Sequence, residues 1–368
     1  MNKPSWISSQ KSHIWIFNIG RGLCIFIRTA LNQGILYDFG SSDDFKPTDF
    51  LEKHIIPHLD KYKELPIAQR IISHPHADHI SNINCLIDED GNEKDMFKAA
   101  LHTCPHHKIN GSAKPEAIDW NRIKNPEGSE DNIEIYKSLY ENGKRSLPLQ
   151  TICYDSPISI PNLEYGLYYI RPPVVDEIYP NNDQEYGNGI SFVFFYRHGH
   201  HTILIPGDIN PDALKHTLDE GKGLEKRYTI FDMTQSRLHP QWHVSSNDQP
   251  SLKSLLSSHG LSILIAPHHG LESGFSEDLY NSIKDKKPGL VVISEKRHLS
   301  ETDGKVDSFY QTTDGAKGQK VYIDGKEENR FSVSTRDNHH ILILFQGTGG
   351  IPAVFLEKDP ERLLGKLC

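Results

Sequence analysis

The chain has 368 residues and a formal net charge of −9 without any block of Lys or Arg, so its charge gives no support to nucleic-acid binding through a basic face. Apolar residues make up 36% of the chain, but the longest apolar runs are of strand length, far below the roughly 20 residues of a membrane helix. The first residues lack the apolar stretch of a secretory signal, and the five cysteines are odd in number and scattered. We therefore expect a cytoplasmic protein without membrane contact and without a disulfide framework.

The N-terminal part begins with short strands and continues with a helix. Apolar patterns predict strands at 13–17, 23–27 and 34–40, joined by turns that contain glycine. Apolar residues at helical spacing predict a helix within 47–63, and a further strand follows and ends at Ile72. This order of strand, helix and strand predicts an α/β protein.

Four potential metal ligands stand within six positions directly after that strand: His74, His76, Asp78 and His79. His74 and His76 are two apart, so in an extended segment their imidazoles project to the same side. Asp78 and His79 are adjacent, so their side chains diverge and suit a second ion beside the first. Imidazole and carboxylate together favour zinc, manganese or iron over calcium or magnesium. The segment therefore predicts a binuclear metal site at a strand end.

Residues 88–150 are the least regular part of the chain. They are rich in Asp, Glu, Asn, Lys and Gly, and we interpret them as a mostly helical insertion that covers or flanks the site. The insertion contains a second group of potential ligands, His102, Cys104, His106 and His107. No matching pair of ligands stands at zinc-ribbon spacing, which favours a polar loop over a second metal site.

Strands resume after this insertion. The pattern predicts strands at 167–170, 192–196 and 202–206, and the last of them ends in a Gly-Asp pair at Asp208. A carboxylate at the tip of a buried strand is placed to reach a site at the strand ends. Taken alone, such an aspartate is more often a helix N-cap, here of a helix predicted over 210–217.

The C-terminal part contains a second polar insertion at 219–248, which we interpret as a surface loop. An apolar strand at 261–266 follows and leads into His268 and His269, a further pair of potential ligands. The remaining helices and strands are predicted at 250–259, 276–283, 289–294, 320–323, 330–334 and 340–345. Residues 347–368 have the pattern of an appended tail.

The ligands at three strand ends together resemble the metallo-β-lactamase fold, a four-layer αββα sandwich, and the resemblance spans nearly the whole chain. It implies one domain over 1–346, interrupted by the two insertions, and a separate tail. In that family an H-x-H-x-D-H motif, a later Gly-Asp and a final His bind two divalent ions, with zinc or manganese expected here. The implied ligands are His74 and His76 for one ion, Asp78, His79 and either His268 or His269 for the other, and Asp208 as the bridge.

Finer motifs resemble one branch of that family, the β-lactamase-like domain of ComEC/Rec2 DNA-uptake proteins and its free-standing relatives. In the order of that branch the motifs are Phe17 to Gly22, similar to its VGQGD turn, Tyr37 to Gly40, similar to its IDTG, Arg171 to Pro173, Asn188 to Ser191, Pro206 to Ile209 and Pro267 to Gly270.

Two departures affect the predicted site. Asn188 stands where most hydrolases of this fold have a histidine, as it does in this branch, and this leaves the first ion poorly held by protein. The turn around Arg21 lacks the Gln and Asp that are usual in the branch. Asp38 has two open interpretations, a residue that orients a ligand histidine and a plain turn carboxylate.

The resemblance implies a binuclear metal-dependent hydrolase, with a phosphodiesterase or nuclease favoured and nucleic acid or another phosphodiester as its substrate. A hydroxide between the two ions would attack phosphorus or a carbonyl carbon, and Asp78 and Asp208 are the candidate catalytic residues. Weaker candidates for substrate or oxyanion contacts are Asn188, Ser191, Lys296 and His298, each of which is also typical of an ordinary polar position.

Two alternatives remain open at this stage. The acidic net charge favours a hydrolase of small esters, lactones or thioesters on the same site. The two insertions and the tail would also suit a subunit of a multi-protein complex, for example in defence or DNA processing, with a latent activity and a protein partner that supplies basic surface.

Overall fold

Both faces of the first strand are buried. In β1 (Ser12–Ile16), Ile14 and Ile16 belong to one hydrophobic cluster, whereas Trp15 and the following Phe17 belong to another. Because successive side chains of a strand point to opposite faces, β1 lies inside a layered structure with apolar layers on both sides. The computed structural model describes residues 10–60, 65–103, 118–126, 128–140, 152–154, 163–170, 172–218, 251–296, 304–347 and 349–367.

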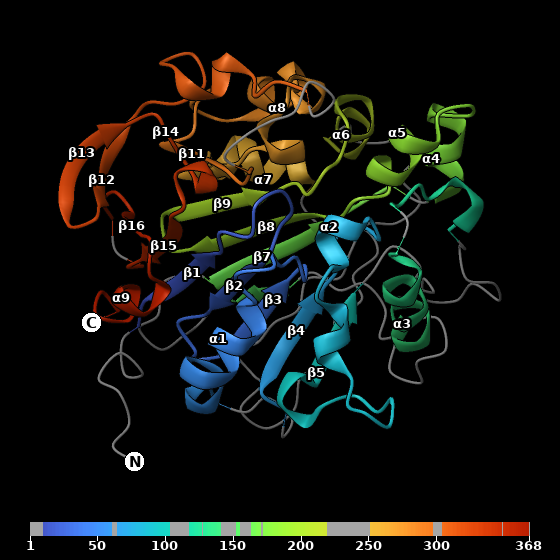
Figure 1. Ribbon diagram of the computed structural model, residues 1–368. Coiled ribbons are helices and arrows are strands. Elements are labelled where there is room, and N and C mark those ends of the chain that lie inside the picture. Colours follow the sequence, from blue (N-terminus) through green and yellow to red (C-terminus); the bar gives the residue numbers. More distant parts are fainter. Residues whose placement is uncertain are drawn as a thin grey trace.

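In this described part of the chain the strands form two mixed sheets (Figure 1). The nine-stranded sheet has the order β13-β12-β16-β15-β1-β2-β3-β4-β5. Its other strands are β2 (Ile25–Arg28), β3 (Gly34–Tyr37), β4 (Ile67–Ile71), β5 (Ala99–Thr103), β12 (Gln319–Ile323), β13 (Lys326–Arg330), β15 (His340–Phe345) and β16 (Ala353–Glu357). The seven-stranded sheet has the order β14-β11-β10-β9-β8-β7-β6. Its strands are β6 (Ile152–Tyr154), β7 (Leu163–Tyr168), β8 (Val193–His198), β9 (His201–Ile205), β10 (Ile263–Ile265), β11 (Leu290–Ile293) and β14 (Ser332–Ser334).

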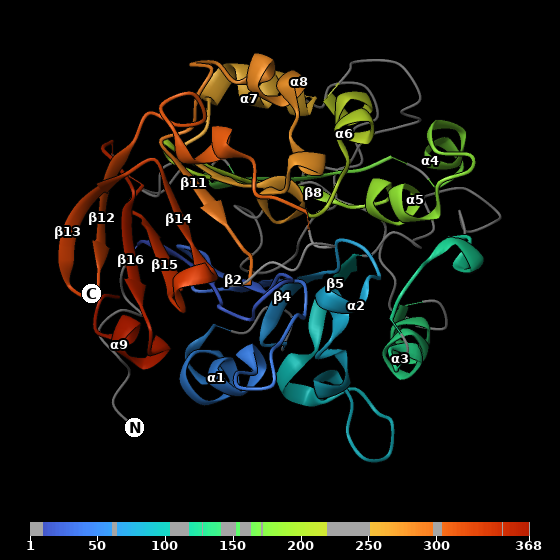
Figure 2. The ribbon, with the colours of Figure 1, turned by 45° about the horizontal axis from the view of Figure 1, so that its top comes forward.

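Helices cover the outer faces of both sheets (Figures 1 and 2). The helices of the described part are α1 (Pro47–His54), α2 (Ala77–Ile80), α3 (Glu130–Tyr140), α4 (Pro172–Ile178), α5 (Asp183–Gly189), α6 (Pro211–Leu218), α7 (Leu252–His259), α8 (Glu277–Ser282) and α9 (Pro360–Leu364), of which α2, α4 and α5 do not cover a sheet face. Helix α1 starts at a proline and packs Phe50 and Leu51 against the outer face of the nine-stranded sheet. Helices α6, α7 and α8 lie on the other side of the molecule, outside the seven-stranded sheet (Figure 2). The predicted four-layer αββα arrangement is confirmed. Among the described residues, no helix has the length and apolarity needed to cross a bilayer.

Parallel pairing determines where the site lies. Strands β3 and β4 are parallel in one sheet, and β9, β10, β11 and β14 are parallel in the other. Parallel strands bring their carboxyl ends to one edge of a sheet, so the loops that follow β3, β4, β9, β10 and β11 are brought together at one end of the sandwich.

Two predicted boundaries are wrong. The segment predicted as an appended tail contains β16, which pairs with β15 and with β12 and so lies inside the nine-stranded sheet. The segment 88–150 is not only an insertion, because β5 pairs in parallel with β4 and extends the same sheet. Helix α3 lies in this segment as predicted, whereas the second insertion, 219–248, lies outside the described residues.

Candidate metal centre

The loops after four strands carry the predicted site residues. Asp38 follows β3, the motif from His74 to His79 follows β4, Asp208 follows β9, and His269 follows β10. Asp208 is not the start of α6, which begins three residues later at Pro211, and its carboxylate instead faces two histidines.

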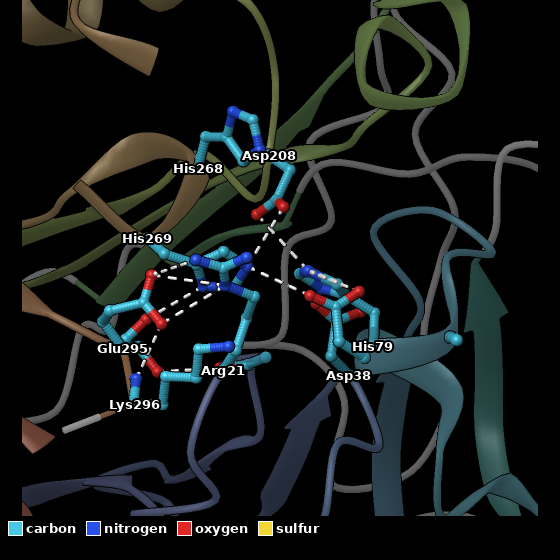
Figure 3. Close-up of polar contacts among 12 residues, drawn as sticks. Arg21, Asp38, His79, Asp208, His268, His269, Glu295 and Lys296 are labelled. Atoms are coloured by element: carbon cyan, nitrogen blue, oxygen red, sulfur yellow. Dashed lines mark hydrogen bonds and ion pairs between the residues drawn. The ribbon is translucent and has the colours of Figure 1, made fainter. Parts of the chain in front are cut away.

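Asp78, His79, Asp208 and His269 form the densest group of ligand atoms, and we call these four residues the His/Asp cluster. One ligand atom from each lies within 4.8 Å of the others. Nε2 of His269 lies 3.2 Å from Oδ2 of Asp78 and 3.2 Å from Oδ2 of Asp208. Nε2 of His79 lies 3.3 Å from Oδ1 of Asp208 and 4.0 Å from Oδ1 of Asp78. Figure 3 shows His79 and His269 approaching the Asp208 carboxylate from the same side.

Asp38 and Ser73 fix the orientation of His79. Oδ2 of Asp38 lies 2.7 Å from Nδ1 of His79, and the Ser73 hydroxyl donates to the same oxygen at 2.7 Å. The Ser73 backbone N–H donates to Oδ1 of Asp38 at 2.6 Å, and the Ser73 hydroxyl is also 3.1 Å from Nδ1 of His74. Because the other ring nitrogen is engaged, Nε2 of His79 is left to face the cluster. The orienting role of Asp38, one of its two open interpretations, therefore fits this geometry.

The geometry selects His269 over His268. Both residues have left-handed backbone angles, with φ of 47° at His268 and 56° at His269, a conformation that non-glycine residues rarely adopt. This turn directs His269 into the cluster, where its Nδ1 hydrogen-bonds the Ser294 carbonyl oxygen at 2.9 Å. His268 instead lies 3.1 Å from the Ser273 hydroxyl, and Figure 3 shows its ring apart from the other two imidazoles. His268 is not part of the His/Asp cluster.

His74 and His76 lie directly beside the cluster. The His74 ring is 4.2 Å from the His79 ring and 4.6 Å from the His76 ring, measured between centroids. Among the described residues, the buried Nε2 atoms of His74 and His76 have no hydrogen-bond partner, whereas Nε2 of His79 has the ion-pair contact with Asp208. Buried polar atoms without partners are rare in proteins, and two of them beside the His/Asp cluster indicate that a ligand completes the site.

The two carboxylates of the His/Asp cluster favour positive charge beside them. Burial disfavours the charged forms of Asp78 and Asp208, but the facing His79 and His269 imidazoles outweigh it and hold both pKa values below their usual range. Burial also opposes protonation of His269, yet Asp208 and Asp78 raise its pKa to about 10. Burial, with His79 and His76 nearby, lowers the pKa of His74, so its imidazole is neutral. Asp208 and Asp78 also raise the pKa of His79, so without a cation His79 and His269 carry the positive charge that faces the two carboxylates. A divalent cation would replace these protons, and carboxylates with imidazoles are donors that zinc or manganese takes, so the residues present fit such an ion.

Two glycines allow the Asp78 backbone to approach the sheet closely. A Cβ at Gly22 would lie 2.2 Å from the Asp78 carbonyl oxygen, and one at Gly40 would lie 2.6 Å from the same atom. These glycines belong to the two N-terminal motifs that carried the resemblance. The presence of glycine in these motifs therefore has a physical reason, because only glycine leaves room for the Asp78 backbone.

The weaker candidates for substrate or oxyanion contacts differ in where the structure places them. Asn188 and Ser191 are buried at the end of α5, where a Cβ at Gly187 would lie 2.3 Å from Nε2 of His76, so this segment adjoins the site. Among the described residues the Ser191 hydroxyl has no hydrogen-bond partner. Lys296 follows Glu295 beyond the end of β11, and Figure 3 shows it beside Glu295. His298 lies outside the described residues, as do Cys104, His106 and His107, while His102 is on β5.

Ser73 and Ser294 were missed by the sequence interpretation. Each contacts a ligand histidine through a hydroxyl or a backbone carbonyl, and nothing in residue type or spacing distinguishes such a serine from others. The available signal was position, because Ser73 directly precedes the His74–His79 motif and Ser294 directly follows β11 at the same end of the sandwich.

Comparisons with known proteins add little to this geometry. No protein-family model matches the chain, and no curated protein matches it. Among solved structures, it is similar to a diphosphatase of the PhnP family with 11% identity over 77% of this chain and 85% of that one, at a TM-score of 0.29. It is also similar to unliganded yeast PDE1, with 13% identity, coverage of 76% and 86%, and a TM-score of 0.33. A third, described as a metal-dependent hydrolase from Parabacteroides distasonis, has 15% identity, coverage of 74% and 89%, and a TM-score of 0.26. At such low TM-scores these matches carry no argument about function.

Proposed function

We propose that this protein is a metal-dependent hydrolase whose centre is the His/Asp cluster with His74 and His76 beside it. The observation that carries the proposal is the convergence of four ligand atoms within 4.8 Å from two different sheets. The Nε2 atoms of His74 and His76, which have no hydrogen-bond partner among the described residues, support it, since a metal ion would accept their lone pairs.

A divalent cation bound there would lower the pKa of a water molecule and offset negative charge on the attacked group. The residues of the chain would supply the rest. Asp38 and Ser294 hold the His79 and His269 rings in place, while Asp208 is buried between those rings. The Asp78 side chain is 32% exposed, more than any other side chain of the cluster, so it is the proposed acceptor of the proton that the attacking water loses.

We further propose two ions with unequal retention. The His/Asp cluster would offer four protein ligands to one ion, whereas His74 and His76 would offer two imidazoles to the other, and the resemblance implies that Asp208 would serve both. Asn188, which stands where a third histidine would complete the second set, offers only an amide. The expectation is a tightly held ion at Asp78 and His79 and a loosely held ion at His74 and His76, with zinc and manganese as the candidate metals.

A phosphodiester, including nucleic acid, is the proposed substrate. Its support is the resemblance of the glycine turn, the Asp38 segment and the later motifs to the DNA-uptake branch. Small esters, lactones or thioesters are the second candidate, supported by the net charge of −9, which disfavours polyanionic substrates.

The test is turnover by metal-stripped protein reloaded with Zn²⁺ or Mn²⁺. The substrates are bis(p-nitrophenyl) phosphate, single- and double-stranded DNA, RNA, a lactone and a thioester. Asp208→Asn should lower turnover by at least about 100-fold, whereas Asp212→Asn, an exposed aspartate on α6, should leave it unchanged. Turnover of lactones or thioesters alone would select the second candidate. Undiminished turnover in Asp208→Asn would contradict the proposal.

The interpretation as an assembly subunit stays a prediction, because most of the segments it relies on lie outside the described residues. Size-exclusion mass and metal content of the isolated chain would test it. A metal-free chain that is stable only with a partner would favour it over the enzyme.

A further inference from the structure

The turn between β1 and β2 carries an arginine that forms an ion pair across the molecule. NH2 of Arg21 lies 3.1 Å from Oε2 of Glu295, and Nε of Arg21 lies 3.3 Å from each carboxylate oxygen. The Glu295 side chain is fully buried, and the Arg21 side chain is 26% exposed. A buried carboxylate is costly without a partner, so the two residues hold each other in a defined position.

This ion pair connects the two sheets at the edge where the metal centre lies. Arg21 belongs to the nine-stranded sheet through the β1–β2 turn, and Glu295 follows β11 of the seven-stranded sheet. A second contact runs alongside it, because the Ser294 hydroxyl donates to the Gly22 carbonyl oxygen at 2.8 Å. Figure 3 shows Arg21, Glu295 and His269 next to one another.

Each end of this connection reaches a residue of the His/Asp cluster. On one side Gly22 lies directly against the Asp78 backbone, as its hypothetical Cβ distance of 2.2 Å shows. On the other side the Ser294 carbonyl oxygen accepts a hydrogen bond from His269 Nδ1 at 2.9 Å. Asp78 and His269 come from different sheets, so their separation depends on how the two sheet edges are held together.

We propose that Arg21 and Glu295 are positioning residues that set the distance between Asp78 and His269 and thereby the affinity for the more tightly held ion. This inference rests on the proposed function only in taking the His/Asp cluster as a metal site. Neither residue touches the ion or the reacting atoms. Their effect passes through Gly22 to Asp78 and through Ser294 to His269.

A purely stabilising ion pair makes a different prediction. Arg70 and Glu93 provide the comparison, since NH1 of Arg70 lies 2.8 Å from Oε1 of Glu93, with side chains 1% and 14% exposed. NH1 of Arg70 also donates to the Phe97 carbonyl oxygen, away from the cluster. Loss of either pair should lower stability, but only loss of the Arg21–Glu295 pair should weaken metal binding.

The experiment measures the affinity of each Zn²⁺ equivalent by competition with a chromogenic chelator, together with urea unfolding of the metal-free chain. The variants are Arg21→Gln, Arg21→Lys, Glu295→Gln, the double variant Arg21→Gln/Glu295→Gln, and Glu93→Gln as the matched control. Removing an outer partner of a metal ligand weakens metal affinity about 10- to 100-fold, so Arg21→Gln and Glu295→Gln should weaken the tighter equivalent about tenfold. Arg21→Lys keeps the charge but not the planar fork and should weaken it less. The double variant should bind no more weakly than the worse single variant, because both changes break one interaction.

Glu93→Gln should leave both affinities within about twofold of wild type at a comparable loss of stability. Affinities in Arg21→Gln and Arg21→Lys that match wild type would overturn the inference, as would an equal weakening in Glu93→Gln. If Glu295→Gln fails to fold, the two Arg21 variants alone decide it. A wild-type chain that binds metal but hydrolyses none of the substrates would remove the proposed function and leave this inference to stand on the affinities. A wild-type chain that binds no metal would overturn both.

Discussion

Oδ2 of Asp38 lies 2.7 Å from Nδ1 of His79, and both side chains are fully buried. Asp38 has a φ of 59°. It follows β3, and its backbone N–H donates to the carbonyl oxygen of Ile71, the last residue of β4, so Asp38 is held at the carboxyl ends of both strands. A residue in a rarely adopted conformation, with its carboxylate on a candidate metal ligand, is a candidate positioning residue for that ligand.

Asp38→Asn is the first prediction. Asparagine has the same size and tolerates a positive φ, so the chain should fold, but it replaces a charged acceptor with a neutral one. We expect Zn²⁺ affinity to fall about 10- to 100-fold with little change in urea unfolding of the metal-free chain. Asp44→Asn, an exposed aspartate after the same strand, is the control and should change neither quantity. Equal affinities for the two variants would contradict an orienting role for Asp38.

The second prediction concerns Gly40→Ala. This substitution tests the space beside Asp78 without adding strain from a left-handed backbone conformation. Gly40 has no left-handed φ, but its added Cβ would lie 2.3 Å from Ile19 and 2.6 Å from the Asp78 carbonyl oxygen. We expect a loss of about 1–3 kcal/mol in the free energy of unfolding, and a weaker metal affinity because Asp78 is displaced.

Gly325→Ala is the matched control for that change. Gly325 has a φ of 79° and no atom within 4 Å of its hypothetical Cβ, so alanine there costs only backbone strain, about 1–2 kcal/mol. Its metal affinity should equal that of wild type. If Gly40→Ala also binds metal normally, the close approach of Gly40 to Asp78 has no bearing on the site.

The convergence of the candidate ligands was predictable because they combine residue type with position. Histidine and aspartate at the ends of predicted strands converge whenever those strands are parallel, as β4, β9 and β10 are within their sheets. The choice between His268 and His269 was not predictable, because it depends on two consecutive left-handed residues, which no local pattern indicates. The Arg21–Glu295 ion pair could not be predicted from the sequence either, since it joins residues 274 positions apart.

Two parts of the fold were misinterpreted for different reasons. Strand β16 is short, and its sequence does not indicate which strands it pairs with. In the structure it fills the space between β12 and β15. The segment between β7 and β8 was given no helix, but it forms α4 and α5. There the signals existed, with a proline at the start of α4 and Asn182 capping α5 by accepting from the Glu185 N–H.

Unequal retention of the two ions gives the third prediction. Titration of the Zn²⁺-loaded protein with a chelator should remove one equivalent well before the other, because four protein ligands surround one position and two imidazoles the other. His76→Ala should abolish the loosely held equivalent and spare the other, whereas His269→Ala should weaken the tightly held one. His268→Ala is the control and should leave both steps in place, since His268 is outside the cluster. Simultaneous loss of both ions from wild type would count against two unequal sites.

The fourth prediction concerns stability in acid and a histidine away from the metal centre. His340 is 4% exposed, its ring lies 4.5 Å from that of Phe45, and its Nδ1 accepts a hydrogen bond from the Asn18 N–H at 3.2 Å. Burial lowers the pKa of His340 to about 4, against an ordinary value of 6.5. Both folded and unfolded chains are neutral at this position above pH 6.5. Below it the unfolded chain takes up the proton first, so stability is lost as the pH falls from about 6.5 towards 4.

His340→Asn tests this contribution, because asparagine offers an acceptor to Asn18 but takes up no proton. The free energy of unfolding in urea, measured from pH 7.5 to 4.5, should fall less steeply in this variant, by up to about 3 kcal/mol over the full interval. His198, whose pKa burial also lowers to about 4, stays in the variant and preserves part of the wild-type slope. His200→Asn, at an exposed position, should follow the wild-type curve. A variant curve parallel to that of wild type would show that His340 does not contribute to the loss of stability in acid.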